Sequence, residues 1–482
     1  MTDMINKIYC ALFMISFVCN AQTRKMPIEF EQWLNTKGMK HATVSLEIAK
    51  IFNSQSQEPE IIYSFDSQRS VQPASVMKLV TTAAALSLLD PDMTVKTEVY
   101  YSGQIKDGVL DGDIIIKGYG NAMLSSSKSQ FPKYSCASDV IQAIKKEGIT
   151  KISGNIIGDG SIFTESPVST EWTWEDMGNH YASSISGLNY GDNTYEIVLN
   201  TSQKGKQPTV IKIEPAVDSL VIDNQLSPLN YSFDSAYVFG APYQNRRTLL
   251  GAVPHRNPTF RVKGDVPDPA QFTASCIKKA LSIHGIEVKG TALSHINKSS
   301  KYTSVKLIYT HRSEPLSYIA KQTNLYSVNL FAEMLLRQLA LKYGNGSETD
   351  GIKSVYSFLK SLKLDTDGIF IYDGCGLAPA DKVTTHFLVC LLNKMYKNKD
   401  FYNTLPIAGK SGTVRAFLKN TKLEGKARLK TGTTKAVVAY SGYVESDDGN
   451  TYIVSIIVNN HTCNSTIVRK NIEKMLLLLI HS

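Results

Sequence analysis

Strand-like segments at both ends of the chain set the strongest limit on its fold. Near the N-terminus, residues 42–50 (ATVSLEIAK) and 60–66 (EIIYSFD) flank a polar connection with Pro59, a pattern typical of a hairpin. Near the C-terminus, GKARLKTGTT, AVVAYSGYVES and TYIVSIIVNN follow one another with short turns, and a helix pattern at 466–480 ends the chain. We expect one antiparallel sheet that takes strands from both ends of the sequence.

The middle of the chain has two parts with different character. Residues 98 to about 300 contain many short strand patterns broken by Gly, Asn and Asp turns, whereas long helical patterns cover 315–341, 348–363 and 384–396. A chain of 482 residues exceeds one ordinary core. We therefore predict an α+β fold of residues 22–97 and 302–482, with 98–301 as a β-rich insertion of two subdomains.

The first 21 residues resemble a secretory signal. Lys7 precedes an apolar run over 8–18, and the small residue Ala21 ends a suitable cleavage site. This run is too short for a permanent transmembrane helix. We predict export to the periplasm or cell envelope with cleavage after Ala21, and the alternative is a lipid anchor on Cys19.

Charge and cysteine content exclude several classes of protein. The formal charge of +9 permits attraction to anionic surfaces, but no basic run interleaved with aromatics suggests nucleic-acid binding, and no later segment could cross a bilayer. The spacing of the cysteines beyond the signal fits no CxxC metal or redox motif, and we expect free thiols and neither metal nor cofactor. These five cysteines are Cys136, Cys276, Cys375, Cys390 and Cys463.

The segment PASVMKLVTTAAALSLLD, residues 73–90, places two reactive groups at the start of an apolar helix. Ser75 and Lys78 are three residues apart, so their side chains share one helix face. A serine hydroxyl is a poor nucleophile unless a base takes its proton, and a buried lysine with a lowered pKa can be that base. The helix N-terminus adds N–H groups and positive potential where an oxyanion would form.

The Ser-x-x-Lys pattern is weak alone, since it also begins at Ser125, Ser275 and Ser357. Two companion motifs strengthen it. Ser327 and Asn329 stand two apart at the start of an apolar helix, and Lys430-Thr431-Gly432 lies in a strand pattern. Gly432 would allow close approach to the strand backbone, while Lys430 and Thr431 offer a cation and a hydroxyl to a carboxylate.

Two further segments mimic the companion motifs. The segment KSGT at 410–413 also fits the third motif, but it precedes a helical VRAF rather than lying in a strand. Thr323-Asn324 lacks the one-residue spacing of the second motif. We therefore select Ser327 and Lys430 over these alternatives.

The three motifs in this order resemble the penicillin-binding proteins and serine β-lactamases. The 252-residue gap from Ser75 to Ser327 is similar to that of the low-molecular-mass class C penicillin-binding proteins, D-alanyl-D-alanine carboxypeptidases and endopeptidases of peptidase family S13. The resemblance covers about residues 30–480 and implies their transpeptidase-like fold. Two positions depart from it: Cys375 replaces a usual serine, and Lys410-Ser411 replace a usual Asp-Gly.

The resemblance implies a role for each motif residue. Ser75 would be acylated by peptidoglycan stem peptides ending in D-Ala-D-Ala, or by β-lactam inhibitors, with Lys78 as the base. Ser327, bonded to both lysines, would relay a proton to the leaving D-alanine, and Asn329 would orient Lys78 and the substrate. Lys430 and Thr431 would hold the terminal carboxylate of the substrate. The backbone N–H groups of Ser75 and Thr433 would stabilise the oxyanion, and Asp159 would contact a substrate amine.

Two other functions stay open at this level. A serine β-lactamase would share the acylation step, but the compact glutamate-bearing loop of class A enzymes has no counterpart here. A catalytically idle envelope protein could bind peptidoglycan through the β-rich insertion, although five intact motif side chains argue against it. Hydrolysis of D-Ala-D-Ala peptides, with carboxypeptidase or endopeptidase preference undetermined, is our leading hypothesis.

Overall fold

The structure is a computed structural model that describes residues 23–52, 58–132, 135–163, 166–228, 234–255, 259–295, 302 and 304–481. The predicted signal segment and the Cys19 alternative lie outside these residues. Among the described residues, no helix has the length and apolar character needed to cross a membrane.

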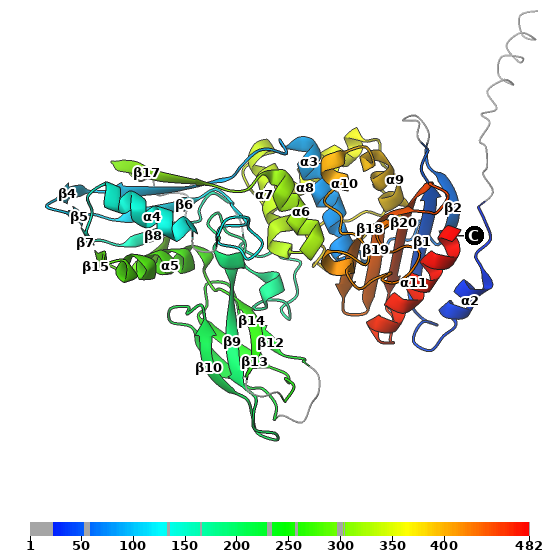
Figure 1. The fold of residues 1–482 in the computed structure, drawn as a ribbon, viewed down its shortest axis with the longest axis horizontal. Helices are drawn as coiled ribbons and strands as arrows, with labels where there is room; N and C mark the ends of the chain where they lie inside the picture. Colours follow the sequence, from blue (N-terminus) through cyan, green and yellow to red (C-terminus); the bar gives the residue numbers. More distant parts are fainter. Residues whose placement is uncertain are drawn as a thin grey trace, which may run out of the picture.

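A five-stranded antiparallel sheet draws its strands from both ends of the chain, as predicted (Figure 1). Its order is β18 (Ala427–Thr434), β19 (Val437–Glu445), β20 (Thr451–Asn459), β1 (Thr43–Lys50) and β2 (Glu60–Phe65). β18 is therefore an edge strand, and its neighbour β19 pairs residue by residue from Ala427↔Val444 to Thr434↔Val437. This edge forms one wall of the candidate site.

Helices cover both faces of this sheet (Figure 1). On one face α2 (Ile28–Leu34) and α11 (Ser465–His481) contribute buried side chains such as Phe30 and Ile472 to a core with the sheet. On the other face lie α6 (Leu316–Tyr326), α7 (Asn329–Tyr343), α8 (Glu348–Ser361), α9 (Thr385–Met395) and α10 (Lys399–Tyr402). Both faces of β1, β19 and β20 are thus buried, which explains the largely apolar sequences of β19 and β20. In β1 the buried polar residues Ser45 and Glu47 are hydrogen-bonded to Thr385 and His386 of α9.

The helix α3 (Lys78–Leu88) runs through the centre of this second layer. It contacts α6, α7 and α8, and every residue from Lys78 to Leu86 is buried. A helix that is apolar on all sides suits such a place. The 3₁₀ turn η1 (Ala74–Met77) precedes it, so Ser75 stands on this turn and Lys78 begins the α-helix.

The β-rich middle of the chain forms two groups of sheets with one continuous core. The first group holds the sheets β16-β8-β6-β3-β17 and β15-β7-β5-β4 with two helices. Its bounds are β3 (Lys96–Ser102), β4 (Gln104–Lys106), β5 (Val109–Asp111), β6 (Ile114–Gly118), α4 (Ser135–Lys146), β7 (Lys151–Ile152), β8 (Ile156–Asp159), α5 (Pro269–Ile283), β15 (Glu287–Val288), β16 (Ala292–His295) and β17 (Val305–Arg312).

The second group projects from the first as a separate lobe (Figure 1). It holds the sheets β10-β9-β14 and β11-β13-β12, with β9 (Thr194–Asn200), β10 (Thr209–Glu214), β11 (Val221–Asn224), β12 (Tyr237–Phe239), β13 (Arg246–Leu250) and β14 (Thr259–Asp265). The predicted α+β class is confirmed. Because β17 pairs with β3, we propose that the insertion ends near residue 312 rather than at 301.

Candidate active site

Ser75 and Lys78 lie in hydrogen-bond contact at the start of the central helix. Lys78 Nζ is 2.9 Å from Ser75 Oγ, 2.6 Å from Asn329 Oδ1 and 2.7 Å from the Cys375 carbonyl oxygen. Ser75 is half-buried, whereas Lys78 is fully buried. The amine is therefore held on three sides, with the serine hydroxyl as its only neighbour among these three that can give up a proton.

Burial lowers the pKa of Lys78, because the charged ammonium loses its hydration in the apolar helix layer. The nearby Cys375, Asp373, Glu333 and Asp381 oppose this shift without reversing it. In its neutral form the amine donates two protons to Asn329 Oδ1 and the Cys375 carbonyl, and its lone pair faces Ser75 Oγ. This geometry suits a general base that removes the serine proton.

The junction between α6 and α7 presents the second motif to the first. α6 ends at Tyr326, Ser327 has a left-handed backbone with φ of 60°, and α7 begins at Asn329. This turn lets Asn329 reach Lys78 with its oxygen and donate its amide N–H to the Tyr181 carbonyl at 2.8 Å. A residue of the insertion thus fixes the orientation of the Asn329 amide.

The third motif on β18 contacts the second. Lys430 Nζ donates to Ser327 Oγ at 2.9 Å and to the Thr431 carbonyl at 2.7 Å. Lys430 is fully buried, and burial, with Lys78 nearby, holds its pKa well below the ordinary value. Among the described hydrogen bonds, Ser327 contacts Lys430 but not Lys78, so the expected bridge of Ser327 between both lysines is formed on one side only.

Gly432 allows the serine turn to lie directly against β18. A Cβ at this position would come within 2.6 Å of the Pro73 carbonyl and 3.1 Å of the Ser75 nitrogen. The close approach that the sequence predicted for a substrate is therefore also used by the protein itself. It brings the Ser75 N–H next to Gly432 at the sheet edge.

Asp373 organises the turn that supports Lys78 from below. Its two carboxylate oxygens accept the backbone N–H groups of the following turn and the indole N–H of Trp172 at 2.8 Å. The turn residues concerned are Cys375, Gly376, Leu377 and Ala378. This arrangement holds the Cys375 carbonyl where it accepts the proton of Lys78.

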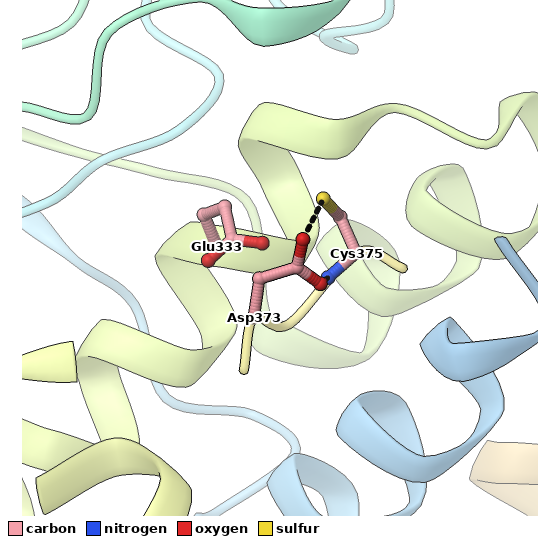
Figure 2. A group of neighbouring side chains, drawn as sticks. All are labelled: Glu333, Asp373 and Cys375. Atoms are coloured by element: carbon pink, nitrogen blue, oxygen red, sulfur yellow. Dashed lines mark hydrogen bonds between the residues drawn. The ribbon is translucent and has the colours of Figure 1, made fainter. Parts of the chain in front are cut away.

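Glu333, Asp373 and Cys375 form a buried group whose ligand atoms lie within 4.8 Å of one another (Figure 2). Both oxygens of Asp373 already accept N–H groups, and Glu333 Oε1 accepts the Gly374 N–H at 2.9 Å. Burial, with Asp373 nearby, raises the pKa of Glu333 well above its ordinary value. Because the oxygens of Asp373 and one oxygen of Glu333 already accept backbone or indole N–H groups, the group suits a hydrogen-bonded support rather than a set of metal ligands.

A cleft of about 1280 Å³ opens over Ser75, between the central sheet with its helices and the insertion. Its walls include the motif residues Ser75, Ser327, Asn329, Thr431 and Thr433, residues of the insertion such as Thr173, Glu175, Asp176 and Tyr181, and Arg469, Lys470 and Glu473 of α11. The three motifs thus share one cleft, with Lys78 and Lys430 buried beneath its surface.

Asp159 and the two rejected segments lie in different settings. Asp159, at the end of β8, is buried outside the cleft lining, where it accepts the Ser161 N–H at 2.9 Å and lies 3.8 Å from Lys117 Nζ. Asn324 is a buried structural residue that donates to Thr82 and Thr404. In the KSGT segment, Thr413 lines the cleft, and Thr431 Oγ1 donates to its hydroxyl at 2.9 Å.

Several site residues were not predicted from the sequence. Thr413 belongs to a segment we had considered only as a competing motif, and Tyr181 acts through a backbone carbonyl that no side-chain pattern marks. The cleft residues of α11 lie more than 30 positions beyond Thr433, in a helix whose sequence indicates only an amphipathic surface. The turn of Asp373 and Gly376 lies under the site, where the Asp373 carboxylate accepts the Gly376 N–H.

A serine beside a buried amine, with a sheet-edge motif in the same cleft, suits the active site of a serine hydrolase. Residues 40–481 match the D-Ala-D-Ala carboxypeptidase 3 (S13) family, and the chain belongs to this family. Its closely similar relatives include the D-alanyl-D-alanine carboxypeptidase of Actinomadura sp. (strain R39), 27% identical over 84% of this chain and 76% of the relative.

Solved structures show the same fold. The crystal structure of penicillin binding protein 4 (dacB) from Haemophilus influenzae has a TM-score of 0.75 and 22% identity, covering 91% of this chain and 96% of that chain. A structure of that protein complexed with a novel β-lactam has a TM-score of 0.72 and 21% identity, covering 92% and 96%. The expected penicillin-binding fold with a large insertion is thereby confirmed.

Proposed function

We propose that this S13 serine carboxypeptidase cleaves peptidoglycan stem peptides ending in D-Ala-D-Ala through an acyl-enzyme on Ser75. The observation that carries the proposal is the 2.9 Å contact between Ser75 Oγ and the amine of Lys78, whose pKa burial lowers. The cleft above this pair has a sheet edge along which an extended peptide can lie.

In the acylation step, Lys78 takes the Ser75 proton as Oγ bonds to the carbonyl carbon of the penultimate D-Ala. The backbone N–H groups of Ser75 and Thr433 stabilise the oxyanion, and Asn329 orients the amine of Lys78 and the substrate amide. As the C–N bond breaks, the leaving nitrogen takes the Ser327 hydroxyl proton, which Lys430 replaces. Their 2.9 Å contact supports this relay.

Deacylation reverses the roles with water in place of the leaving amine. Water attacks the ester carbon and gives up a proton through Ser327 to Lys430, the bond between the carbonyl carbon and Ser75 Oγ breaks, Ser75 regains its proton from Lys78, and the shortened peptide leaves. Lys430 and Thr431 border the place of the substrate carboxylate. A β-lactam would open on Ser75 by the same first step, and we propose an envelope location, where both the polymer and such inhibitors are met. Asp159 has no role in this scheme because it lies outside the cleft lining.

The test is incubation of the purified enzyme with monomeric and cross-linked muropeptides, with products identified by mass. We expect loss of one alanine from pentapeptide monomers, and a Ser75→Ala variant with the same thermal stability should release none. Rapid turnover of nitrocefin without D-alanine release would instead indicate a β-lactamase. Absence of both activities in the folded wild-type enzyme would contradict the proposal.

A further inference from the structure

The positive charge that faces the cleft beside the catalytic strand comes from α11 and from Lys435 in the β18–β19 turn, not from β18 itself. Lys430 is fully buried and is not part of the cleft lining, and its amine donates to Ser327 and to the Thr431 carbonyl. Arg469 does line the cleft, and its Nη2 donates to Thr433 Oγ1 at 3.2 Å. A guanidinium is thus fixed at the third motif from a different element.

Along β18, Arg469 lies about one residue length beyond the expected position of the scissile bond. Gly432 packs against the Ser75 turn, so the attacked carbonyl lies next to it, and Thr433 follows one residue further along the strand. Neighbouring residues in a strand advance by about 3.3 Å. A carboxylate on the residue that supplies the scissile nitrogen would therefore lie at about the distance of the Thr433 side chain, where Arg469 is held.

The surroundings leave the guanidinium free to receive an anion. Among the described residues Arg469 forms no ion pair, and its only hydrogen bond there goes to Thr433. Glu473, one turn along α11, accepts the Leu418 N–H at 2.6 Å and so faces another partner. Arginine presents several N–H donors in one plane, which matches both oxygens of a carboxylate and keeps its charge at every working pH.

We propose that Arg469 is a specificity-determining residue that binds the carboxylate α to the scissile nitrogen. This inference rests on the proposed function and names the part of the substrate that the enzyme selects. It predicts that the enzyme prefers leaving residues with a free α-carboxylate over neutral ones, whether that residue is a terminal D-alanine or part of a cross-link. Thr433 and Thr431 would supply hydroxyl contacts to the same group.

The test compares two peptides that differ only in this group, one ending in D-Ala-D-Ala and one in D-Ala-D-alaninamide. We expect Arg469→Gln to lower kcat/KM for the acid by about 10- to 100-fold, the size of a charge-assisted contact, with little change for the amide. Arg469→Lys, which keeps the charge, should restore part of the acid preference. Lys474→Gln, the same charge change on an exposed part of α11 outside the cleft, is the control and should keep the wild-type ratio.

Three results separate the possible failures. An equal loss on acid and amide in Arg469→Gln would show that Arg469 only supports the strand, and wild-type rates on both peptides would show that it does not bind the carboxylate. Either result overturns this inference and leaves the proposed function intact. If the wild-type enzyme cleaves neither peptide, the proposed function itself is wrong.

Discussion

At the residue scale, the site depends on an amine that is buried without a carboxylate as direct hydrogen-bond partner. Lys78 is bonded to a hydroxyl, an amide oxygen and a backbone carbonyl, all of them neutral. Neutral partners satisfy its protons without stabilising the charged form as strongly as an ion pair would. This choice of partners keeps the amine of Lys78 available as a base. Burial also lowers the pKa of Lys430, which makes its ammonium a readier proton donor to Ser327.

The lowered pKa of Lys78 fixes the direction of the pH dependence. The neutral amine forms as the pH rises through this lowered pKa, so the rate of acylation by a fluorescent penicillin should rise with pH and then level off. Lys78→Arg, which stays charged, should lose acylation at every pH at which circular dichroism shows a folded protein. An acylation rate in the wild-type enzyme that falls over the same rise in pH would contradict a lysine base.

At the element scale, the close packing of three segments positions the nucleophile. η1, β18 and the turn after Asp373 meet at Ser75, and two glycines permit this meeting. A Cβ on Gly376 would lie 2.0 Å from the Ala74 carbonyl, and one on Gly432 would lie 2.6 Å from the Pro73 carbonyl. Ala74 itself has a left-handed backbone with φ of 47°, a strained conformation that the surrounding contacts maintain.

Gly432→Ala tests this packing. The added methyl group should displace the serine turn from β18 and slow acylation by about 100-fold, because a shift of about 1 Å has such an effect on a reacting group. The matched control is Gly449→Ala in the β19–β20 turn, where a Cβ meets no atom within 4 Å. The control should lose some stability, since its φ is 78°, but keep the wild-type acylation rate. Equal acylation rates in the two variants would argue against the packing account.

The sequence predicted the helices and strands more directly than it predicted which motifs meet in space. The strand patterns at both chain ends predicted the central sheet, because alternation and short turns are local signals. The meeting of Ser75, Asn329 and Lys430 depended on the resemblance, since contacts across hundreds of residues leave no local pattern. Arg469 and Thr413 were missed for the same reason. The pairing of β17 with β3, on which our proposed boundary near residue 312 rests, also leaves no local signal, because a strand's pairing partner is not encoded in its own composition.

At the scale of the whole molecule, the insertion forms part of the active site rather than a separate module. Its segment around Thr173–Tyr181 lines the cleft, the Tyr181 carbonyl orients Asn329, and the Trp172 indole bonds to Asp373. Trp172 is buried in the same core as α3 and α7. The insertion therefore contacts the turn beneath Lys78, and we expect it to influence catalysis at a distance from Ser75.

Trp172→Ala tests this coupling between the two units. Loss of a buried indole should lower the free energy of unfolding by about 3–5 kcal/mol, and the released Asp373 turn should slow acylation. Trp174→Ala is the control, because Trp174 is 61% exposed and should contribute little to either quantity. Chemical denaturation and penicillin acylation of both variants provide the measurement. A destabilised Trp172→Ala enzyme with an unchanged acylation rate would show that the insertion does not support the site.

The most direct test of the central claim is to map the covalent adduct of a labelled penicillin by mass spectrometry of proteolytic peptides. The account predicts one adduct, on Ser75, in the wild-type enzyme, and none in Ser75→Ala or Lys78→Arg variants that unfold at the wild-type temperature. An adduct on another residue, or labelling of Ser75→Ala at the wild-type rate, would contradict it.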